Sequence, residues 1–278
     1  MKKEFLSKSS IFLMAGLAFV TFTAGMCGDE NESESDDNGG GNKTETYKDK
    51  WANLVNENKK DCTVNGNTLT YGNHTYTVEG EINYDSPGDH KTATAWVKFT
   101  NIPSGYTEFK AVYEGLLGKS IQGTAAMIPM AFEIYARNAS TGEKCLQLCC
   151  NSSVTVSTIL SELKRKIVLS KYSDENDSYI QRYIPAALLK GAAFNNAYTP
   201  DEPYTVEMCP HVTPPQEIRI TGDGMDYFVY ILAPGGWDTF QRGVEIYQNW
   251  DGGLYKVYNC PSTYTGCKTI RGTWAGLK

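Results

Sequence analysis

The stretch "GTAAMIPMAFEIYARN", residues 123–138, lies inside a long block of helical pattern. Thr124 is a suitable N-cap and Asn138 a suitable end, so we expect one helix between them. Pro129 is tolerated near the first turn of a helix. It should bend this helix if it lies deeper, because proline removes a backbone donor.

Further helical segments surround this one. The segment "YTEFKAVYEGLL" (106–117) stops at Gly118, and glycine commonly ends a helix. Ser140 and Glu143 open the next segment with the spacing of a capping box. Three other segments are expected to be helical: "SSVTVSTILSELKRKIVL" (152–169), "DSYIQRYIPAALLKGAAF" (177–194) and, far upstream, "ETYKDKWANLVNENKK" (45–60).

Segments with the period of a β-strand lie on both sides of the helical block. Residues 67–102 are rich in Thr, Tyr and Val and are broken at residues 72–73 and 87–88, which predicts three antiparallel strands. After the block, residues 204–259 form five short alternating runs, with glycine placed for hairpin turns at 222–224 and 251–253. We therefore expect an α+β fold in which a helical layer packs on an antiparallel β-meander, with an N-terminal β-hairpin unit. The expected division is a helix and hairpin segment over 45–105 and an α+β domain over 106–278.

The N-terminus has the features of an export signal. Lys2, Lys3 and Lys8 precede an apolar run at 11–25, which is too short to span a bilayer comfortably. Residues 24–27, "AGMC", resemble a bacterial lipobox, although Met26 departs from the small residue preferred before the cysteine. We expect residues 1–26 to be a signal peptide and Cys27 to carry the lipid (palmitate or a similar chain). Cleavage by an ordinary signal peptidase and secretion is the alternative.

The segment after Cys27 is strongly acidic. Residues 1–26 hold three Lys and one Glu (+2) and residues 27–37 hold six acids (−6), so the rest of the chain carries −6 − 2 + 6 = −2. A charged, glycine-rich stretch without apolar residues is typical of a solvated tether, which we assign to 27–44. The stretch resembles the acidic export signal of lipoproteins of Bacteroides-like bacteria. We therefore expect a lipid-anchored protein of the cell envelope, exposed on the outer membrane.

Several classes of function are disfavoured. The nearly neutral remainder has no basic stripe to follow a phosphate backbone, so nucleic acid is not an expected partner. "EGLLGKS" (114–120) ends like a P-loop but lacks the first glycine and follows a helix. With three histidines and no second ligand pair beside Cys209 and His211, neither a metal nor another cofactor is expected. No catalytic motif is present, although distant residues can converge in space.

Cysteines and tryptophans supply the remaining candidates. Cys260 and Cys267 bracket a short, turn-rich loop and are predicted to form a disulfide. Trp237, next to Gly235, Gly236 and Asp238, is expected at an exposed loop tip, and Trp250 is a second candidate ligand contact. Exposed aromatic faces can stack on sugar rings. They can equally fill the core face of a sheet.

Three stretches resemble an uncharacterised bacterial family, a domain of unknown function found in envelope lipoproteins. They are "GTAAMIPMAFEIY", "YIPAALLKGAAFNNAYTPDEPYTVEM" and "DTFQRGVEIYQNWDGGLYKVY". The resemblance covers about residues 106–258 and implies no activity or catalytic residue. We expect a surface protein that binds or shields an extracellular glycan or protein ligand without catalysis. A surface hydrolase of glycan or peptide, or a glycan-binding accessory protein, is the alternative.

Overall fold

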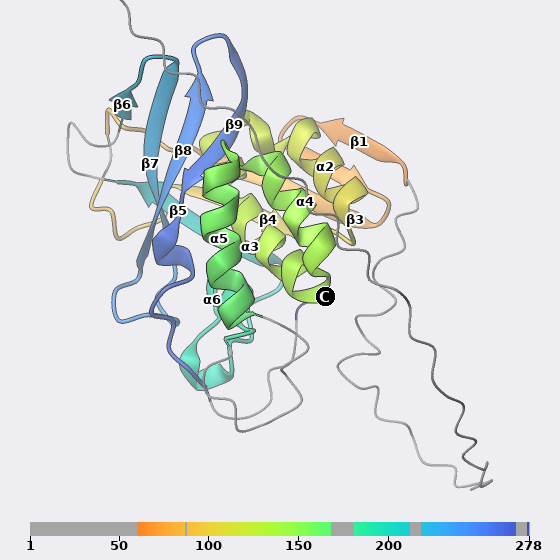
Figure 1. Cartoon of the computed structure of the whole chain (residues 1–278), viewed down its shortest axis with the longest axis vertical. Helices are drawn as coiled ribbons and strands as arrows, with labels where there is room; N and C mark the ends of the chain where they lie inside the picture. Colours follow the sequence, from red (N-terminus) through yellow and green to blue (C-terminus); the bar gives the residue numbers. More distant parts are fainter. Residues whose placement is uncertain (1–59, 87, 168–180, 212–217, 271–276, 278) are drawn as a thin grey trace, which may run out of the picture. The chain divides into compact units, whose positions relative to one another are not determined.

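The computed structural model describes residues 60–278 except 87, 168–180, 212–217, 271–276 and 278 (Figure 1). Residues 45–278 group as one compact unit. The predicted signal peptide, Cys27, the tether and the helix expected at 45–60 lie outside the described residues. No helix among the described residues is long and apolar enough to cross a membrane.

All strands of the described chain join one antiparallel sheet. Its order is β1-β2-β3-β4-β5-β7-β8-β9, and β6 also pairs with β7. The first four strands are β1 (Cys62–Asn65), β2 (Thr68–Tyr71), β3 (His74–Gly80) and β4 (Ala95–Phe99). The others are β5 (Tyr204–Pro210), β6 (Ile218–Ile220), β7 (Gly224–Leu232), β8 (Gln241–Asn249) and β9 (Gly252–Asn259). Because β4 pairs with β5, the segments divided in sequence at residue 105 share this sheet.

The helices lie between β4 and β5 in the chain. They are α2 (Tyr106–Gly115), α3 (Ile121–Arg137), α4 (Ala139–Cys149), α5 (Ser153–Lys166) and α6 (Ile184–Ala187). Helix α3 contacts β4, β7, β8 and β9, and α4 packs on α3 and contacts β9 (Figure 1). The α+β fold with a helical layer on an antiparallel meander is therefore confirmed.

Helix α3 is the centre of the core. Every residue from Gln122 to Ala136 is buried, because helices cover one side of α3 and the sheet covers the other. An unbroken apolar run is typical of such an all-round buried helix. Phe132, Met127 and Met130 have no exposed surface.

Two predicted N-caps are wrong by a few residues. Helix α3 is capped by Ser120, whose hydroxyl accepts from the Gly123 backbone N–H at 3.1 Å, and not by Thr124. Helix α4 is capped by Asn138, whose side chain accepts from the Thr141 N–H at 3.0 Å, and not by Ser140. Asn138 thus both ends α3 and starts α4, so the two helices follow each other without a loop. The helix predicted over 177–194 is reduced in the described part to the four residues of α6.

Candidate functional site

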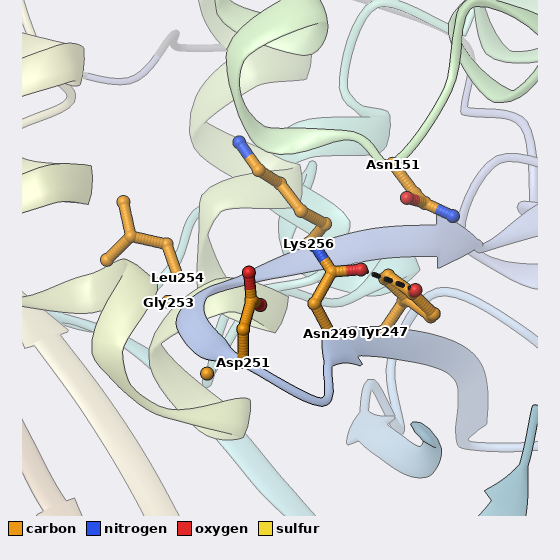
Figure 2. Close-up of a pocket in the computed structure, with 8 residues that line it drawn as sticks. Asn151, Tyr247, Asn249, Asp251, Gly253, Leu254 and Lys256 are labelled. Carbon is orange, nitrogen blue, oxygen red and sulfur yellow. Dashed lines mark hydrogen bonds between the residues drawn. The ribbon is translucent and has the colours of Figure 1, made fainter. Parts of the chain in front are cut away.

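A hollow of about 400 Å³ lies beside the β8–β9 hairpin, where the turn between α4 and α5 approaches it. We call it the hairpin pocket. Its lining side chains are Asn151, Tyr247, Asn249, Asp251, Leu254 and Lys256, with Gly252 and Gly253 at the hairpin tip. Figure 2 shows Asn151 on the α4–α5 turn and the others on the hairpin. The pocket therefore joins parts of the chain about a hundred residues apart.

Glycine gives the hairpin its tight end. Gly252 and Gly253 have φ of +81° and +88°, a region that side-chain-bearing residues rarely adopt. Asn249 pairs directly with Gly252, so Trp250 and Asp251 form the connection. The Trp250 backbone N–H donates to the Asp223 carbonyl at 3.1 Å, which fixes the tip against the β6–β7 turn. The hairpin predicted from residues 251–253 is present, with Trp250 and Asp251 as its connection and the two glycines at the start of β9.

The α4–α5 turn is held against the outer edge of β9. Cys150 forms a bridge with Val257, and the Asn151 N–H donates to the Val257 carbonyl at 2.8 Å. Ser152 caps α5 by accepting from the Thr155 N–H at 3.2 Å. These bonds hold Asn151 at a defined position in the pocket wall.

The lining of the pocket includes one basic side chain, Lys256, and one acidic side chain, Asp251. The Lys256 ammonium donates to the Leu148 carbonyl near the C-terminus of α4 and lies 5.0 Å from the centre of the Tyr113 ring. Burial lowers the pKa of Lys256 from its ordinary value. Asp251 has no hydrogen bond or ion pair with another described residue. The formal charges of the two groups cancel, so the pocket suits a neutral polar ligand.

Amide and hydroxyl groups complete the lining. The Tyr247 hydroxyl donates to Asn249 Oδ1 at 2.6 Å, which leaves the Asn249 amide hydrogens available to a ligand (Figure 2). The Asn151 side chain makes no hydrogen bond within the described chain. A side-chain amide has two hydrogen-bond donors and an acceptor, whereas a carboxylate has acceptors only. Asn151, Asn249 and Asp251 together can therefore bind a ligand that carries both donors and acceptors.

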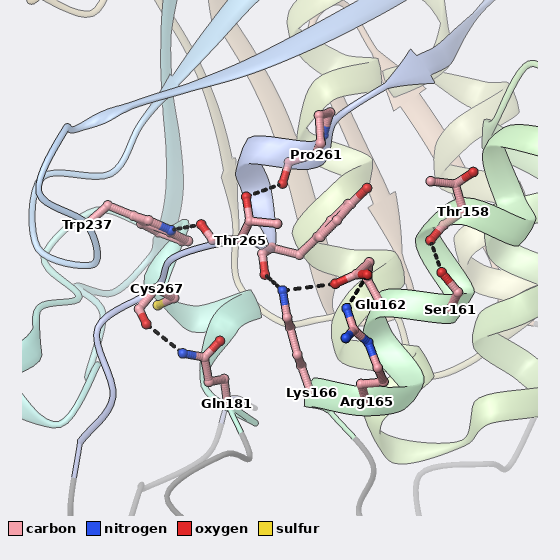
Figure 3. Close-up of polar contacts among 11 residues, drawn as sticks. Thr158, Ser161, Glu162, Arg165, Lys166, Gln181, Trp237, Pro261, Thr265 and Cys267 are labelled. Carbon is pink, nitrogen blue, oxygen red and sulfur yellow. Dashed lines mark hydrogen bonds and ion pairs between the residues drawn. The ribbon is translucent and has the colours of Figure 1, made fainter.

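The two candidate tryptophans have opposite environments. Trp250, between the lining residues Asn249 and Asp251, is 54% exposed. Trp237 is 3% exposed, and the expectation of an exposed loop tip is wrong. Its indole N–H donates to the Thr265 carbonyl at 2.7 Å (Figure 3). The Arg242 guanidinium lies 5.0 Å from its ring centre. The segment after β9 covers Trp237, so this side chain belongs to the core.

The structure holds the thiols of Cys260 and Cys267 as free, buried groups. The Cys267 thiol lies 3.7 Å from the Tyr198 hydroxyl, while the pKa of Cys260 is raised to about 12, first by burial. Within the loop, the Thr265 hydroxyl donates to the Pro261 carbonyl at 2.8 Å, and the Gln181 side-chain amide donates to the Cys267 carbonyl at 2.6 Å from outside it (Figure 3). The predicted disulfide is thus not present in this structure. No group of three His, Cys, Asp or Glu side chains in the described chain is arranged to hold a metal ion.

A second polar cluster surrounds Glu108 on α2, away from the hairpin pocket. This buried carboxylate accepts hydrogen bonds from His74 Nδ1 at 2.7 Å, from the Tyr76 hydroxyl at 2.8 Å and from the Ser104 N–H and hydroxyl at 2.9 and 2.7 Å. Burial alone would raise the pKa of Glu108, but the bonds from His74, Ser104 and Tyr76 outweigh it and lower the pKa. Glu108 therefore stays ionised and fastens the start of α2 to β3.

The Glu108 cluster gives a prediction for acid stability. Because the pKa of Glu108 is lowered on folding, its contribution is present above the unfolded pKa of about 4.3 and is lost as the pH falls through the folded value. Glu108→Gln should lower the unfolding free energy at pH 7 by about 1–3 kcal/mol, since a charged acceptor is removed. It should also flatten the decline of stability below about pH 5. Urea unfolding between pH 3 and 7 measures both, with the half-exposed Glu114→Gln on the same helix as control. A variant as acid-sensitive as the wild type would contradict this role.

Sequence patterns indicated only part of the site. Trp250 and the hairpin turn were expected, whereas Asn151, Asn249, Asp251 and Lys256 were not singled out as site residues. For Asn249, Asp251 and Lys256, the sequence indication of a site was that these polar residues surround the Asp-Gly-Gly turn. Nothing near Asn151 in the sequence shows that it meets β9.

Comparison with known proteins gave one match. The family model described as "Domain of unknown function (DUF6935)" matches residues 101–271, which include every lining residue of the hairpin pocket. Neither the curated proteins nor the solved structures gave a match.

Proposed function

Because the chain belongs to the DUF6935 family, whose function is unknown, we propose its role from its own site: the domain binds a neutral glycan at the hairpin pocket. We further propose that lipid on Cys27 holds the domain at the outside of the cell envelope. The observation that carries the binding role is the exposed Trp250 next to a pocket of uncompensated amide and carboxylate groups.

The chemistry of the pocket suits a polyhydroxylated ligand. A sugar ring has apolar faces, which pack on the flat face of an aromatic side chain such as Trp250, and hydroxyl groups around its rim. Those hydroxyls can donate to Asp251 and exchange bonds with the amides of Asn151 and Asn249. A few convergent polar groups beside apolar surface are the usual composition of a small-molecule site.

The same lining favours binding over hydrolysis. Glycoside hydrolysis generally uses two carboxyl groups on opposite sides of the scissile bond. The side chains that line the hairpin pocket include one carboxyl group, that of Asp251. Glu108 belongs to the separate cluster on α2 and β3, where its oxygens already accept hydrogen bonds.

The proposed location rests on the sequence before the folded unit. The lipobox-like residues, the cysteine and the acidic tether precede residue 45, at which the compact unit begins. A tether of this kind would give the domain access to polymers outside the cell.

Removing the indole of Trp250 should abolish most of the affinity. We expect Trp250→Ala to weaken binding about 10-fold or more, since an aromatic anchor contributes about 1–3 kcal/mol. Purified residues 45–278, which form one compact unit, would be screened on an array of neutral oligosaccharides, and the hits measured by titration calorimetry.

The matched control is Phe194→Ala. Phe194 is 49% exposed but lies beside Gly235 in the β7–β8 connection, at the opposite end of β8 from Trp250, so its loss should leave the affinity unchanged. Equal losses in both variants, or the absence of binding to any neutral glycan, would overturn the proposed function.

A further inference from the structure

A second hollow, of about 320 Å³, lies on the other side of the α4–α5 turn. We call it the α5 groove. Its lining includes Ser152, Val154 and Thr155 from the start of α5 and Tyr258 and Asn259 from the end of β9. Like the hairpin pocket, it has one wall from β9 and one from the α4–α5 region.

The two hollows are neighbours along β9. Leu254 and Lys256 line the hairpin pocket and Tyr258 lines the α5 groove. Alternate residues of a strand point to the same side at about 3.3 Å per residue, so Lys256 and Tyr258 are separated by about 7 Å. On the opposite wall, Asn151 lines the first hollow and Ser152 the second. The bond between Asn151 and Val257 lies between the two hollows.

Exposed apolar side chains gather along the same line. Five large apolar side chains are exposed in the described part of the chain: Val64, Val154, Phe194, Trp250 and Tyr258. Three of them are Trp250 beside the hairpin pocket and Val154 and Tyr258 in the α5 groove. Exposed apolar side chains next to polar groups, such as Val154 and Tyr258 in the α5 groove, are typical of an interaction site.

We propose that the α5 groove is a second subsite for the ligand of the hairpin pocket, which is therefore a glycan chain of several units. This inference rests on the proposed function. A single sugar is too small to contact both Trp250 and the Tyr258 ring, while a chain passing over the Asn151–Val257 bridge reaches both. In the α5 groove, the 40% exposed Tyr258 ring offers a stacking surface.

Polar groups in the α5 groove suit the same ligand. The Thr155 hydroxyl donates to the Tyr258 carbonyl at 2.9 Å and accepts from the Ser152 hydroxyl at 3.1 Å, which leaves one of its two lone pairs for a ligand. The Asn259 side-chain amide has no hydrogen bond within the described chain, so it can exchange bonds with sugar hydroxyls. None of the described side chains that line this groove is ionised, in agreement with a neutral ligand.

The test measures how affinity depends on the length of the oligosaccharide. Residues 45–278 would be titrated with one neutral oligosaccharide series, chosen from the array, from the monosaccharide to the hexasaccharide. We expect the affinity to rise about 5- to 10-fold from the disaccharide to the tetrasaccharide or longer. Tyr258→Ala should remove this rise and leave disaccharide affinity unchanged, whereas Trp250→Ala should weaken all lengths. Tyr258→Phe, which keeps the ring, should retain the rise.

The outcomes separate the two proposals. If no oligosaccharide of any length binds, the proposed function fails. If short glycans bind and depend on Trp250, but the affinity is independent of length or of Tyr258, the second subsite fails and the proposed function stands. Thermal unfolding of each variant checks that the fold is intact.

Discussion

Glu133→Gln is expected to lower the free energy of unfolding by about 3–5 kcal/mol, one of the two largest effects in this protein. Glu133 lies on α3 and has no exposed surface. Its carboxylate accepts from both terminal nitrogens of Arg182 at 2.6 and 2.7 Å and from Arg137 Nε at 2.9 Å. Although burial would raise the pKa of Glu133, the two guanidinium groups lower it, so the carboxylate is ionised.

The loss is large because the substitution removes a buried carboxylate that two guanidinium groups bind. Arg182 is fully buried and the Arg137 side chain is 5% exposed, so water cannot replace the carboxylate. Removing one member of a buried ion pair leaves an uncompensated charge in a medium that solvates it poorly. The network also joins three distant parts of the chain, since Arg137 donates to the Leu277 carbonyl at 3.1 Å.

Urea unfolding at pH 7 measures the effect. Glu143→Gln is the matched control, because it makes the same change at an exposed position of the next helix and should alter stability by less than about 0.5 kcal/mol. Replacing Glu133 and Arg182 together by leucine should recover part of the loss, since both charges are then removed. A loss below about 1 kcal/mol in Glu133→Gln would show that the network is not important for stability.

The pairing of Glu133 with Arg182 could not be predicted from the local sequence. The spacing of Glu133 and Arg137 is that of an ordinary pair on one helix face. Arg182, however, follows Glu133 by 49 residues and belongs to a segment that was read only as helix. Local periodicity predicts that an element exists, but the partner of a buried charge depends on how the elements pack.

Elements with a strong local signal were predicted best. The glycines at 222–224 and 251–253 indicated the β6–β7 and β8–β9 turns, and at Gly252 and Gly253 the backbone has the positive φ that few other residues adopt. Strand β1 was missed, since its four residues are all exposed and carry no alternating pattern.

The exposure of the two candidate tryptophans likewise depends on packing and not on local sequence. Trp237 and Trp250 both stand beside glycine and aspartate, so their local sequences do not separate them. Trp237 is buried because the Thr265 carbonyl and Arg242 reach it from other segments, whereas Trp250 remains exposed at a hairpin tip. The hairpin pocket needed Asn151 as well, and only the bridge to Val257 brings that residue to β9.

Cys27→Ala is expected to abolish lipid attachment completely. This is the second of the two largest expected effects. In the proposed anchor, the sulfur of Cys27 carries the acyl chains, and alanine has no nucleophile to accept them. Each buried CH₂ contributes about 0.8 kcal/mol, and one acyl chain binds membranes only reversibly, so stable anchoring needs two. The full-length chain would be expressed in a lipoprotein-producing bacterium fed an alkyne-tagged fatty acid, and the label on the protein measured.

Cys62→Ala is the control, because Cys62 is an exposed thiol of the folded unit and its loss should leave the label unchanged. The mature N-terminus, determined by mass spectrometry, distinguishes the two expected processing routes. An acylated Cys27 at the first position supports the anchor. An unacylated chain that begins elsewhere and accumulates in the medium would instead establish secretion. The proposed glycan site would be unaffected in that case, because the hairpin pocket is lined by residues between 151 and 256 and does not depend on how the chain is tethered.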